Sequence, residues 1–533
     1  MMNKLAWEAP DAGDWWSVRE HFPYPVSQLF ATLFPAATVG WKTGGARYGL
    51  TTGEPRWAAV NGFIYFGPPH PLTADEHAAR EIAAVLTLAA ASATTTTPWQ
   101  TEVRRWHDEE RPAARAANLG LQAVNVQDLD DVALSAHLQR TMANFGGWAP
   151  LHFEHTAFDI AAGFLLRLTD RSGIAGHAVI ELLTGASPAS AAVDRRLGAV
   201  AEALEAAGAP RCSTLGEVRD ADVLAAAALD SFLEEYRWRP VAGHDVLEPT
   251  LGERPDLLVA SIAARRARHR AATDVTAAAD AMRCAVPEPD RATFDRLLTD
   301  ARAAYALRDD DVGICWNWPL GLIRRAGLET GRRLAAANVI EDPGDVFEAA
   351  IDELPGVLAG RGPGARELAR RRDVRVRAAA SVPPMHLAGG GSPVATPTPT
   401  SAVAELTAVR DRLWSVAPPR LERPLHGIGI NAASAVGRAR VVAGPDDIAN
   451  LEDGDILVAV ATSTAFNAVF PLVAAVVTEQ GGILSHAAIL AREVGVPAVV
   501  GVADVFDFVR DGDIVEVNPI AGSVRVVDPP APR

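Results

Sequence analysis

The sequence has 533 residues, of which 49% are apolar, and a formal net charge of −16. A chain of this length exceeds one ordinary hydrophobic core, so we expect two or three domains. The acidic balance excludes nucleic acid and anionic membranes as main partners, because both require a basic face. We also find no run of about 20 predominantly apolar residues and no signal peptide. These features predict a cytoplasmic protein.

The cysteines and lysines of the sequence limit the kinds of site that the chain can form. The three cysteines are widely spaced, which fits a reducing compartment and offers neither a disulfide framework nor a metal site. The only lysines are Lys4 and Lys42, and no Gly-rich phosphate loop is followed by a lysine. An ATP site held by lysine is therefore hard to place in this sequence.

The residue composition and periodicity of the chain change in three places. The first 70 residues are rich in Trp, Pro and Gly and predict irregular structure with short strands near Ala58–Phe66. A helical pattern then runs to about residue 380. A linker is predicted over 381–424, in which residues 381–402 are rich in Pro and Gly and flexible, and the residues after them are again helical or irregular. Residues 425–528 alternate short β-like runs with turns and predict a compact α/β domain, followed by a tail at 529–533.

The segment 478–501 holds the most informative pattern. Gly481 and Gly482 allow a tight turn and the close approach of another molecule. Ser485 suits an N-cap, His486–Val494 reads as a short helix, and Gly495 is placed to end it. His486 should therefore lie in the first helical turn. Free backbone N–H groups and the positive end of the helix dipole there would favour a phosphoryl group on the imidazole.

Arg492, six residues after His486, has two interpretations. Its charge could neutralise a transferred phosphoryl group, although the spacing aligns it poorly with His486 on an ideal helix. A structural ion pair is an equally good explanation.

The motif GGILSHAAILAREVGVPAVVG resembles the phosphohistidine swivelling domain of the PEP-utilising enzymes, such as phosphoenolpyruvate synthase and pyruvate phosphate dikinase. The stretches 427–442 and 453–466 resemble earlier parts of the same domain, with Phe466 and Asn467 where Trp and Thr are more usual. The resemblance implies a β/β/α swivelling domain in which His486 is transiently phosphorylated. The fold class is then a mostly α-helical substrate-type domain over 1–380, followed by this domain.

Stretches within 7–66 and 331–354 are similar to the helical middle domain of rifampin phosphotransferase, which binds the phosphoryl acceptor in that family. The chain shows neither an ATP-grasp domain nor a pyruvate-handling barrel. This arrangement resembles the swivelling-domain subunits of phenylphosphate synthase and 4-methylphenyl phosphate (cresol) synthase. The resemblance implies that a separate ATP-grasp subunit binds ATP and Mg²⁺, that a covalent phosphohistidine forms, and that a small phenol or aromatic alcohol is the acceptor.

A phenol benefits from a general base, and three histidines are candidates. His152 and His155 would share one helix face, with Asp159 beyond them, if that segment is helical; the alternative is a partly buried helix with satisfied histidines. His21 lies in a family-like motif. We place no metal site. Weaker pocket candidates are Arg308 with Asp309–Asp311, and the pair Trp316/Trp318 near Cys315.

Two other functions stay open at this point. The acceptor could instead be the hydroxyl of an antibiotic or another natural product. The chain could also be a non-catalytic phosphocarrier or regulatory protein.

Overall fold

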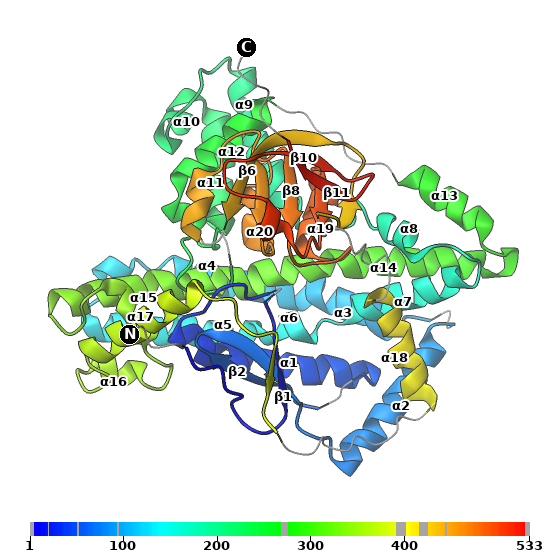
Figure 1. Ribbon diagram of the computed structural model, residues 1–533, viewed down its shortest axis with the longest axis horizontal. Coiled ribbons are helices and arrows are strands. Elements are labelled where there is room, and N and C mark those ends of the chain that lie inside the picture. Colours follow the sequence, from blue (N-terminus) through cyan, green and yellow to red (C-terminus); the bar gives the residue numbers. More distant parts are fainter. Residues whose placement is uncertain are drawn as a thin grey trace. The chain divides into compact units, whose positions relative to one another are not determined.

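The computed structural model describes residues 5–19, 21–50, 53–92, 95–241, 243–267, 275–390, 401–414, 425–442 and 445–527 (Figure 1). The chain forms two compact units, each assembled from separate stretches of sequence. The first unit comprises Met1–Ile160, His244–Leu247 and Asp311–Arg410. The second unit comprises Ala161–Gly243, Glu248–Asp310 and Asp411–Arg533.

The first unit is mainly helical, with one small sheet. Its regular elements are β1 (Asp14–Ser17), α1 (Gln28–Tyr48), β2 (Arg56–Val60), β3 (Phe63–Gly67), α2 (Ala74–Ala90), α3 (Pro98–Arg105), α4 (Arg111–Gln122), α5 (Asp131–Trp148), α6 (Pro150–Glu154), α15 (Trp318–Ala336), α16 (Leu354–Leu358), α17 (Ala365–Ala379), β4 (His386–Ala388) and α18 (Ser401–Trp414). Short 3₁₀ turns cover Val126–Asp128 and Pro343–Glu348, and π-helical turns cover Trp106–Glu110 and Val312–Asn317.

Local sequence explains where helix α1 begins and ends. The Ser27 side chain accepts a hydrogen bond from the N–H of Phe30, which caps the helix. Gly49 ends it with a φ of 82°, a conformation that glycine adopts without strain. Gly40 and Gly44 face α6 so closely that an added Cβ would lie 1.9 Å from the carbonyl oxygen of Pro150 and 2.2 Å from that of Glu154. These glycines allow α1 and α6 to pack backbone against backbone.

The small sheet has the order β2-β3-β1-β4 and is antiparallel throughout. The strands predicted near Ala58–Phe66 are confirmed as β2 and β3. The predicted linker is wrong at its start, because β4 pairs with β1, whereas α18 lies where helical or irregular structure was expected after residue 402. Leu387 of β4 is buried, and so are Val403, Leu406, Val409 and Leu413 of α18, which gives both segments a reason to order. Residues 391–400 and 415–424 of the linker, and the predicted tail, lie outside the described residues.

The second unit joins helices to a larger sheet. Its regular elements are α7 (Ala157–Asp170), α8 (Gly176–Glu181), α9 (Ala192–Ala206), α10 (Leu215–Ala221), α11 (Val223–Tyr236), α12 (Pro255–Ala267), α13 (Thr276–Ala285), α14 (Arg291–Asp311), β5 (Ile428–Ile430), β6 (Ala435–Val442), β7 (Ile456–Ala459), β8 (Ala475–Thr478), α19 (His486–Val494), β9 (Ala498–Val500), α20 (Val505–Phe508), β10 (Ile514–Asn518) and β11 (Ser523–Val526). Short 3₁₀ turns cover Leu251–Glu253, Glu288–Asp290, Pro445–Asn450 and Thr464–Ala468.

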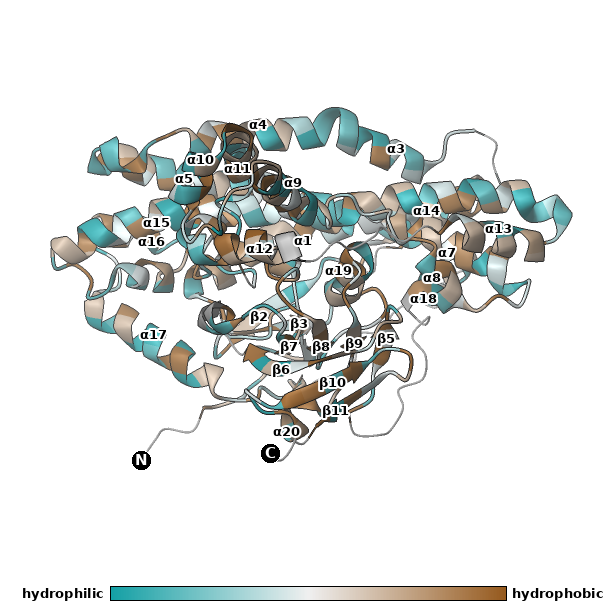
Figure 2. Cartoon of the chain, turned by 90° about the horizontal axis from the view of Figure 1, so that it is seen from above, coloured by the Kyte–Doolittle hydropathy of each residue, from teal (hydrophilic) through white to brown (hydrophobic). Residues whose placement is uncertain are grey.

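The large sheet has the order β11-β10-β6-β7-β8-β9-β5. Strands β6 to β9 are parallel, while β5, β10 and β11 are antiparallel additions at the edges. Every residue of β7, β8 and β9 is buried, as expected for parallel strands covered on both faces. Figure 2 shows the hydrophobic character of β10 and β11; β10 buries alternate residues, whereas β11 buries Val524 alone. The predicted α/β domain is confirmed.

The boundary predicted at residue 380 differs from the observed division. One face of the sheet shares a hydrophobic core with helices α9, α11 and α12, through side chains such as Leu197, Phe232, Phe466 and Phe470. Residues 161–310 therefore group with the sheet rather than with the first 160 residues. Sequence texture cannot reveal this, because helices of both units have the same composition. None of the described helices is long and apolar enough to cross a membrane.

Candidate functional site

The predicted phosphate carrier lies at one edge of the large sheet. His486 follows strand β8, while Thr462 and Asn467 follow the neighbouring parallel strand β7. Carboxyl ends of parallel strands meet at the same edge, which is where open α/β sheets place ligand sites. The fold thus brings the loops after β7 and β8 together around one imidazole.

The start of helix α19 agrees with the sequence prediction. Ser485 has an extended backbone and its Oγ accepts from the N–H of Ala488 at 3.4 Å, so it is the N-cap. Gly495 ends the helix with a φ of 70°. Gly481 has a φ of 119°, and a Cβ there would lie 2.9 Å from Ser485 Oγ, whereas a Cβ on Gly482 would meet only open space. Gly481 is needed for the turn, and Gly482 leaves room beside it.

Hydrogen bonds hold both ring nitrogens of His486. Its Nε2 is 2.9 Å from Asn467 Oδ1, and its Nδ1 is 3.1 Å from Thr462 Oγ1. Asn467 Nδ2 donates to the carbonyl oxygen of Ser190 at 3.3 Å, so its Oδ1 must be the atom that faces the imidazole. An amide oxygen only accepts, and therefore Nε2 carries the proton while Nδ1 accepts from the Thr462 hydroxyl.

The imidazole of His486 is neutral. Its burial, with the positive charge of Arg308 as the smaller cause, lowers the pKa of His486 to about 3. A neutral imidazole has the lone pair that a nucleophile requires. In the arrangement described, one nitrogen holds a proton and the other accepts a hydrogen bond, so a phosphoryl group needs one of these two contacts to open.

Arg492 supports the loop in front of His486. Its side chain is 6% exposed, and Nη1 donates to the carbonyl oxygen of Ile483 at 2.7 Å. It also hydrogen bonds to Tyr305 of α14. Charge neutralisation and an ion pair, the two roles predicted for this residue, stay predictions. The contact with Ile483 fixes the turn between Gly482 and Ser485.

The far end of helix α19 is held by a loop of the helical part of the same unit. Glu493 Oε1 accepts from the N–H groups of Gly185 and Ser187 at 3.0 and 3.3 Å. Burial raises the pKa of Glu493 to about 7, although the same two hydrogen bonds oppose the rise. The carbonyl of Ser190 in this loop is the one that orients Asn467. The loop therefore influences both ends of the helix that carries His486.

His152 and His155 of the first unit do not share one helix face. Helix α6 ends at Glu154, His155 adopts an extended conformation, and α7 begins at Ala157. The prediction of a continuous helix with Asp159 is wrong on this point. Both histidines instead bind Asp311, with His152 Nδ1 3.0 Å from Oδ1 and His155 Nδ1 2.7 Å from Oδ2.

The two histidines differ in chemistry. The side chain of His155 is 1% exposed and also lies 3.2 Å from Glu110 Oε2. Burial opposes its charge, but the hydrogen bonds to Asp311 and Glu110 outweigh burial and raise the pKa of His155 to about 9. His155 is therefore an imidazolium between two carboxylates at neutral pH, which cannot accept a proton. His152 has a side chain that is 30% exposed and remains a candidate base.

His21 is exposed in a turn after β1, where its N–H donates to the carbonyl oxygen of Val18 at 3.0 Å. Its neighbour Phe22 packs edge-on against Phe34 with ring centroids 5.0 Å apart. The motif that contains His21 thus contributes at least one residue to the aromatic core of the first unit.

Sequence reasoning did not identify Thr462, Asn467, Glu110 or Asp311 as partners of these histidines. Thr462 and Asn467 had one available signal, because they follow the strand that precedes β8. Asp311 is 156 residues from His155 in the sequence, and no local pattern reveals such a contact.

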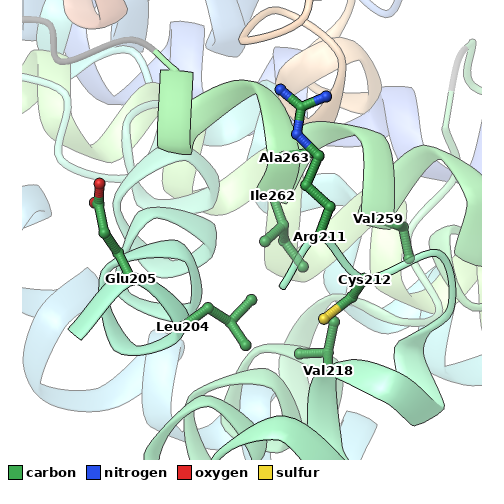
Figure 3. Close-up of a pocket in the computed structure, with 8 residues that line it drawn as sticks. All are labelled: Leu204, Glu205, Arg211, Cys212, Val218, Val259, Ile262 and Ala263. Atoms are coloured by element: carbon green, nitrogen blue, oxygen red, sulfur yellow. The ribbon is translucent and has the colours of Figure 1, made fainter. Parts of the chain in front are cut away.

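A separate cavity lies among helices of the second unit. It has a volume of about 240 Å³ and is lined by Leu204, Glu205, Arg211, Cys212, Val218, Val259, Ile262 and Ala263 (Figure 3). None of the residues predicted for catalysis lines it. Among the residues that the structure describes, no group of His, Cys, Asp and Glu could hold a metal ion.

Two segments match known protein families. Residues 451–522 match the mobile domain of PEP-utilising enzymes. Residues 156–309 match the fourth domain of rifampicin phosphotransferase. The second match lies outside the stretches 7–66 and 331–354, which suggested the same family from sequence motifs. It covers the helices that pack on the large sheet.

Three relatives are each similar to a part of this chain. The chain is 37% identical to an uncharacterised protein of Mycobacterium tuberculosis over 233 residues, which are 42% of this chain and 24% of that protein. It is 28% identical to rifampicin phosphotransferase of Streptomyces sviceus over 321 residues, 56% of this chain and 34% of the relative. It is 41% identical to rifampicin phosphotransferase of Bacillus cereus over 101 residues, 19% of this chain and 12% of the relative.

These findings define the class to which the fold and site correspond. The chain combines a mobile domain of the PEP-utilising type with a helical region like that of the rifampicin phosphotransferases. Its matched parts span about a third or less of the three relatives above.

Proposed function

We propose that the protein is a phosphotransferase that carries a phosphoryl group on His486 and delivers it to a hydroxyl group of a small molecule. The observation that carries the proposal is the neutral imidazole at the start of α19, inside the segment that matches a PEP-utilising mobile domain. Free N–H groups of a helix start stabilise phosphate oxygens. Loose phosphoryl-transfer transition states need positioning and charge neutralisation more than covalent help.

The phosphoryl group is proposed to reach Nε2 of His486. The Nε2–H bond to Asn467 opens, the proton moves to Nδ1, and the Thr462 hydroxyl turns to accept it. The Nε2 lone pair then attacks phosphorus, a P–N bond forms, and the P–O bond to the donor breaks with its electron pair on the leaving oxygen. Thr462 suits this change because a hydroxyl both donates and accepts.

The proposed donor is ATP with Mg²⁺, bound by a separate ATP-grasp subunit. The composition supports this division, because the sequence has two lysines and no glycine-rich loop followed by lysine. An ATP donor and three cysteines that form no disulfide among the described residues favour a cytoplasmic reaction.

The proposed acceptor is a small aromatic alcohol of the phenol or cresol type. A second candidate is the hydroxyl of an antibiotic or other natural product, which is favoured by the relatives named rifampicin phosphotransferase. In a phosphocarrier without small-molecule turnover, the same phosphohistidine would form but no phosphorylated acceptor would appear.

The central experiment mixes the protein with a co-encoded ATP-grasp protein, ATP and Mg²⁺. We expect an acid-labile phosphoryl adduct on His486, measured by intact mass and peptide mapping, and no adduct on His486→Ala. An acid-stable Ser or Thr phosphate, or equal labelling of His486→Ala, contradicts the mechanism. Labelling by ATP without the second protein contradicts the two-subunit proposal.

A panel of acceptors then separates the alternatives. Phenol, 4-methylphenol and rifampicin are each added to the labelled protein, and transfer is followed by loss of the adduct and by ³¹P NMR of the product. An aryl phosphate supports the leading proposal, whereas phosphorylated rifampicin alone supports the second candidate. An adduct that no member of the panel discharges favours the phosphocarrier.

A further inference from the structure

A group of partly exposed aromatic rings lies beside His152 on the first unit. We call Trp41, Trp57, Phe66 and Phe153 the aromatic platform. Trp41 of α1 stacks on Phe153 of α6, with ring centroids 5.7 Å apart and planes inclined by 13°, and on Phe66 of β3 at 6.4 Å and 23°. Trp57 of β2 contacts Phe66 at 5.2 Å. The rings come from three parts of the chain that the fold brings together.

The platform depends on a close helix crossing. Gly40 and Gly44, on either side of Trp41, allow the backbone of α1 to contact that of α6. This contact places Trp41 against Phe153 and next to His152, whose ring is 5.1 Å from that of Phe153. Trp41 nevertheless remains 47% exposed. A large exposed ring within such a cluster is typical of a surface that binds another molecule.

Two indole donors in the same cluster have no use in the described structure. Nε1 of Trp57 and Nε1 of Trp316 are buried, and neither has a hydrogen-bond partner among the residues that the structure describes. Both rings pack edge-on against Phe34, and Trp316 is only 3% exposed. Buried donors are usually satisfied, so the Nε1–H of Trp57, a platform member, is a donor that no described residue uses, whereas Trp316 belongs to the buried core beneath.

His152 adds a base at the edge of the platform. Its Nδ1 lies 3.0 Å from Asp311 Oδ1, and a carboxylate that binds the His155 imidazolium can only accept. Nδ1 therefore carries a proton, and the tautomer with a lone pair presents it on Nε2. A buried carboxylate that orients an imidazole in this way is the arrangement by which enzymes position a general base.

We infer that the platform binds the aromatic ring of the phosphoryl acceptor and that His152 accepts the proton of its hydroxyl group. The inference rests on the proposed function and adds the location and chemical class of the acceptor. The acceptor O–H bond breaks, its proton goes to His152 Nε2, and the oxygen attacks the phosphorus of phospho-His486. The P–N bond breaks with its electron pair on the imidazole nitrogen, and an aryl phosphate leaves.

Binding is tested without any phosphoryl donor, by titrating 4-methylphenol into the full chain and measuring the dissociation constant by calorimetry. We expect Trp41→Ala to weaken binding about tenfold or more and Trp41→Phe to retain most of it. Phe508→Ala is the control, because Phe508 is also a large exposed ring, 50% exposed, and belongs to α20 of the second unit rather than to the platform. Equal losses for Trp41→Ala and Phe508→Ala, or no loss for Trp41→Ala, overturn the site.

The role of His152 is tested by His152→Gln. We expect 4-methylphenol to bind within about threefold of the wild-type affinity, the His486 adduct to form at the normal rate, and transfer to the phenol to fall about 100-fold or more. The base role is overturned if transfer is unchanged, or if its pH dependence is the same in both proteins.

The phosphotransfer on His486 and the aromatic site can be disproved separately. A protein that forms no adduct on His486 but binds 4-methylphenol through Trp41 loses the proposed function and keeps the aromatic site. A protein that forms the adduct but binds 4-methylphenol independently of Trp41 keeps the phosphotransfer and loses the site. Binding of rifampicin but not of 4-methylphenol through Trp41 overturns the small-phenol class.

Discussion

His486 of the second unit and His155 of the first unit are both enclosed by the fold, but they have opposite charges. Around His486 the partners are a hydroxyl and an amide, which supply no charge, so burial dominates and the imidazole is neutral. Around His155 two carboxylates outweigh burial and the imidazole is positive. The partners of a buried histidine, rather than its burial, decide whether it is available as a nucleophile.

The largest expected effect is on stability when His155 is removed. His155→Ala leaves Asp311 and Glu110 buried without the charge between them, so we expect the free energy of unfolding to fall by about 3–5 kcal/mol. His137→Ala is a useful control, because His137 is also buried but burial lowers its pKa. Denaturant unfolding should show a smaller loss there, of about 1–2 kcal/mol. Equal losses would show that the two carboxylates add nothing.

The same residue should make stability depend on pH. The folded pKa of His155, about 9, lies above the unfolded value of about 6.5. Its contribution is therefore complete below pH 6.5 and is lost as the pH rises through 9, by about 3 kcal/mol in total. Unfolding measured at pH 6.5, 8 and 9.5 should show this decline in the wild-type protein and not in His155→Ala. A flat wild-type profile would contradict a charged His155.

A smaller effect is expected at the turn before His486. Gly481→Ala forces a Cβ against Ser485 at a φ of 119°, which should cost about 1–3 kcal/mol and slow phosphorylation of His486. Gly482→Ala meets open space and should change stability by less than about 0.5 kcal/mol. Thermal unfolding and the rate of adduct formation measure both variants. Similar results for the two would remove the special role of Gly481.

Replacing the amide that binds His486 should have an effect of about 1 kcal/mol. Asn467→Leu removes the acceptor of the Nε2–H bond, so we expect Nε2 to accept a phosphoryl group from phosphoramidate about 3- to 10-fold faster. The ¹⁵N shifts of His486 should also move away from the Nε2–H tautomer. Asn144→Leu is a control, because its side-chain amide donates to Asn118 in the first unit, away from the helix that carries His486. Slower labelling of Asn467→Leu would mean that Asn467 assists the transfer instead.

The smallest expected effect concerns pH: we expect the protonation states of His486 and His155 to stay the same between pH 5 and 8. The folded pKa values of about 3 and about 9 lie outside this window. ¹H–¹⁵N spectra of the imidazoles should therefore show a neutral ring for His486 and a charged ring for His155 at every pH. A midpoint near 6.5 for either residue would remove the contrast between the two sites.

The sequence predicted the second site better than the first for a physical reason. The β-like runs, the Ser485 cap, the helix from His486 to Val494 and the Gly495 stop are local features, and all of them are confirmed. The Asn467 contact depends on which loops share a sheet edge, and its orientation depends on the carbonyl of Ser190, 277 residues away. Periodicity contains no information on such pairs.

The histidines of the first unit show where local reasoning fails. The spacing of His152 and His155 suggested one helix face, but helix α6 ends at Glu154, between the two histidines. Asp311 then binds both rings from 159 and 156 residues away. The aromatic platform has the same character, since Trp41, Phe66 and Phe153 become neighbours only through the packing of α1 on α6 and β3.

The interleaved order of the two units limits how this protein can be divided. The first unit needs Asp311 from beyond residue 310, and the large sheet shares its core with helices between residues 161 and 310. A fragment that starts at residue 425 would expose the apolar face that Phe466 and Phe470 present to those helices. We therefore expect gene fission or domain exchange at residue 425 to cost the phosphate carrier stability, unless its helical cover is transferred with it.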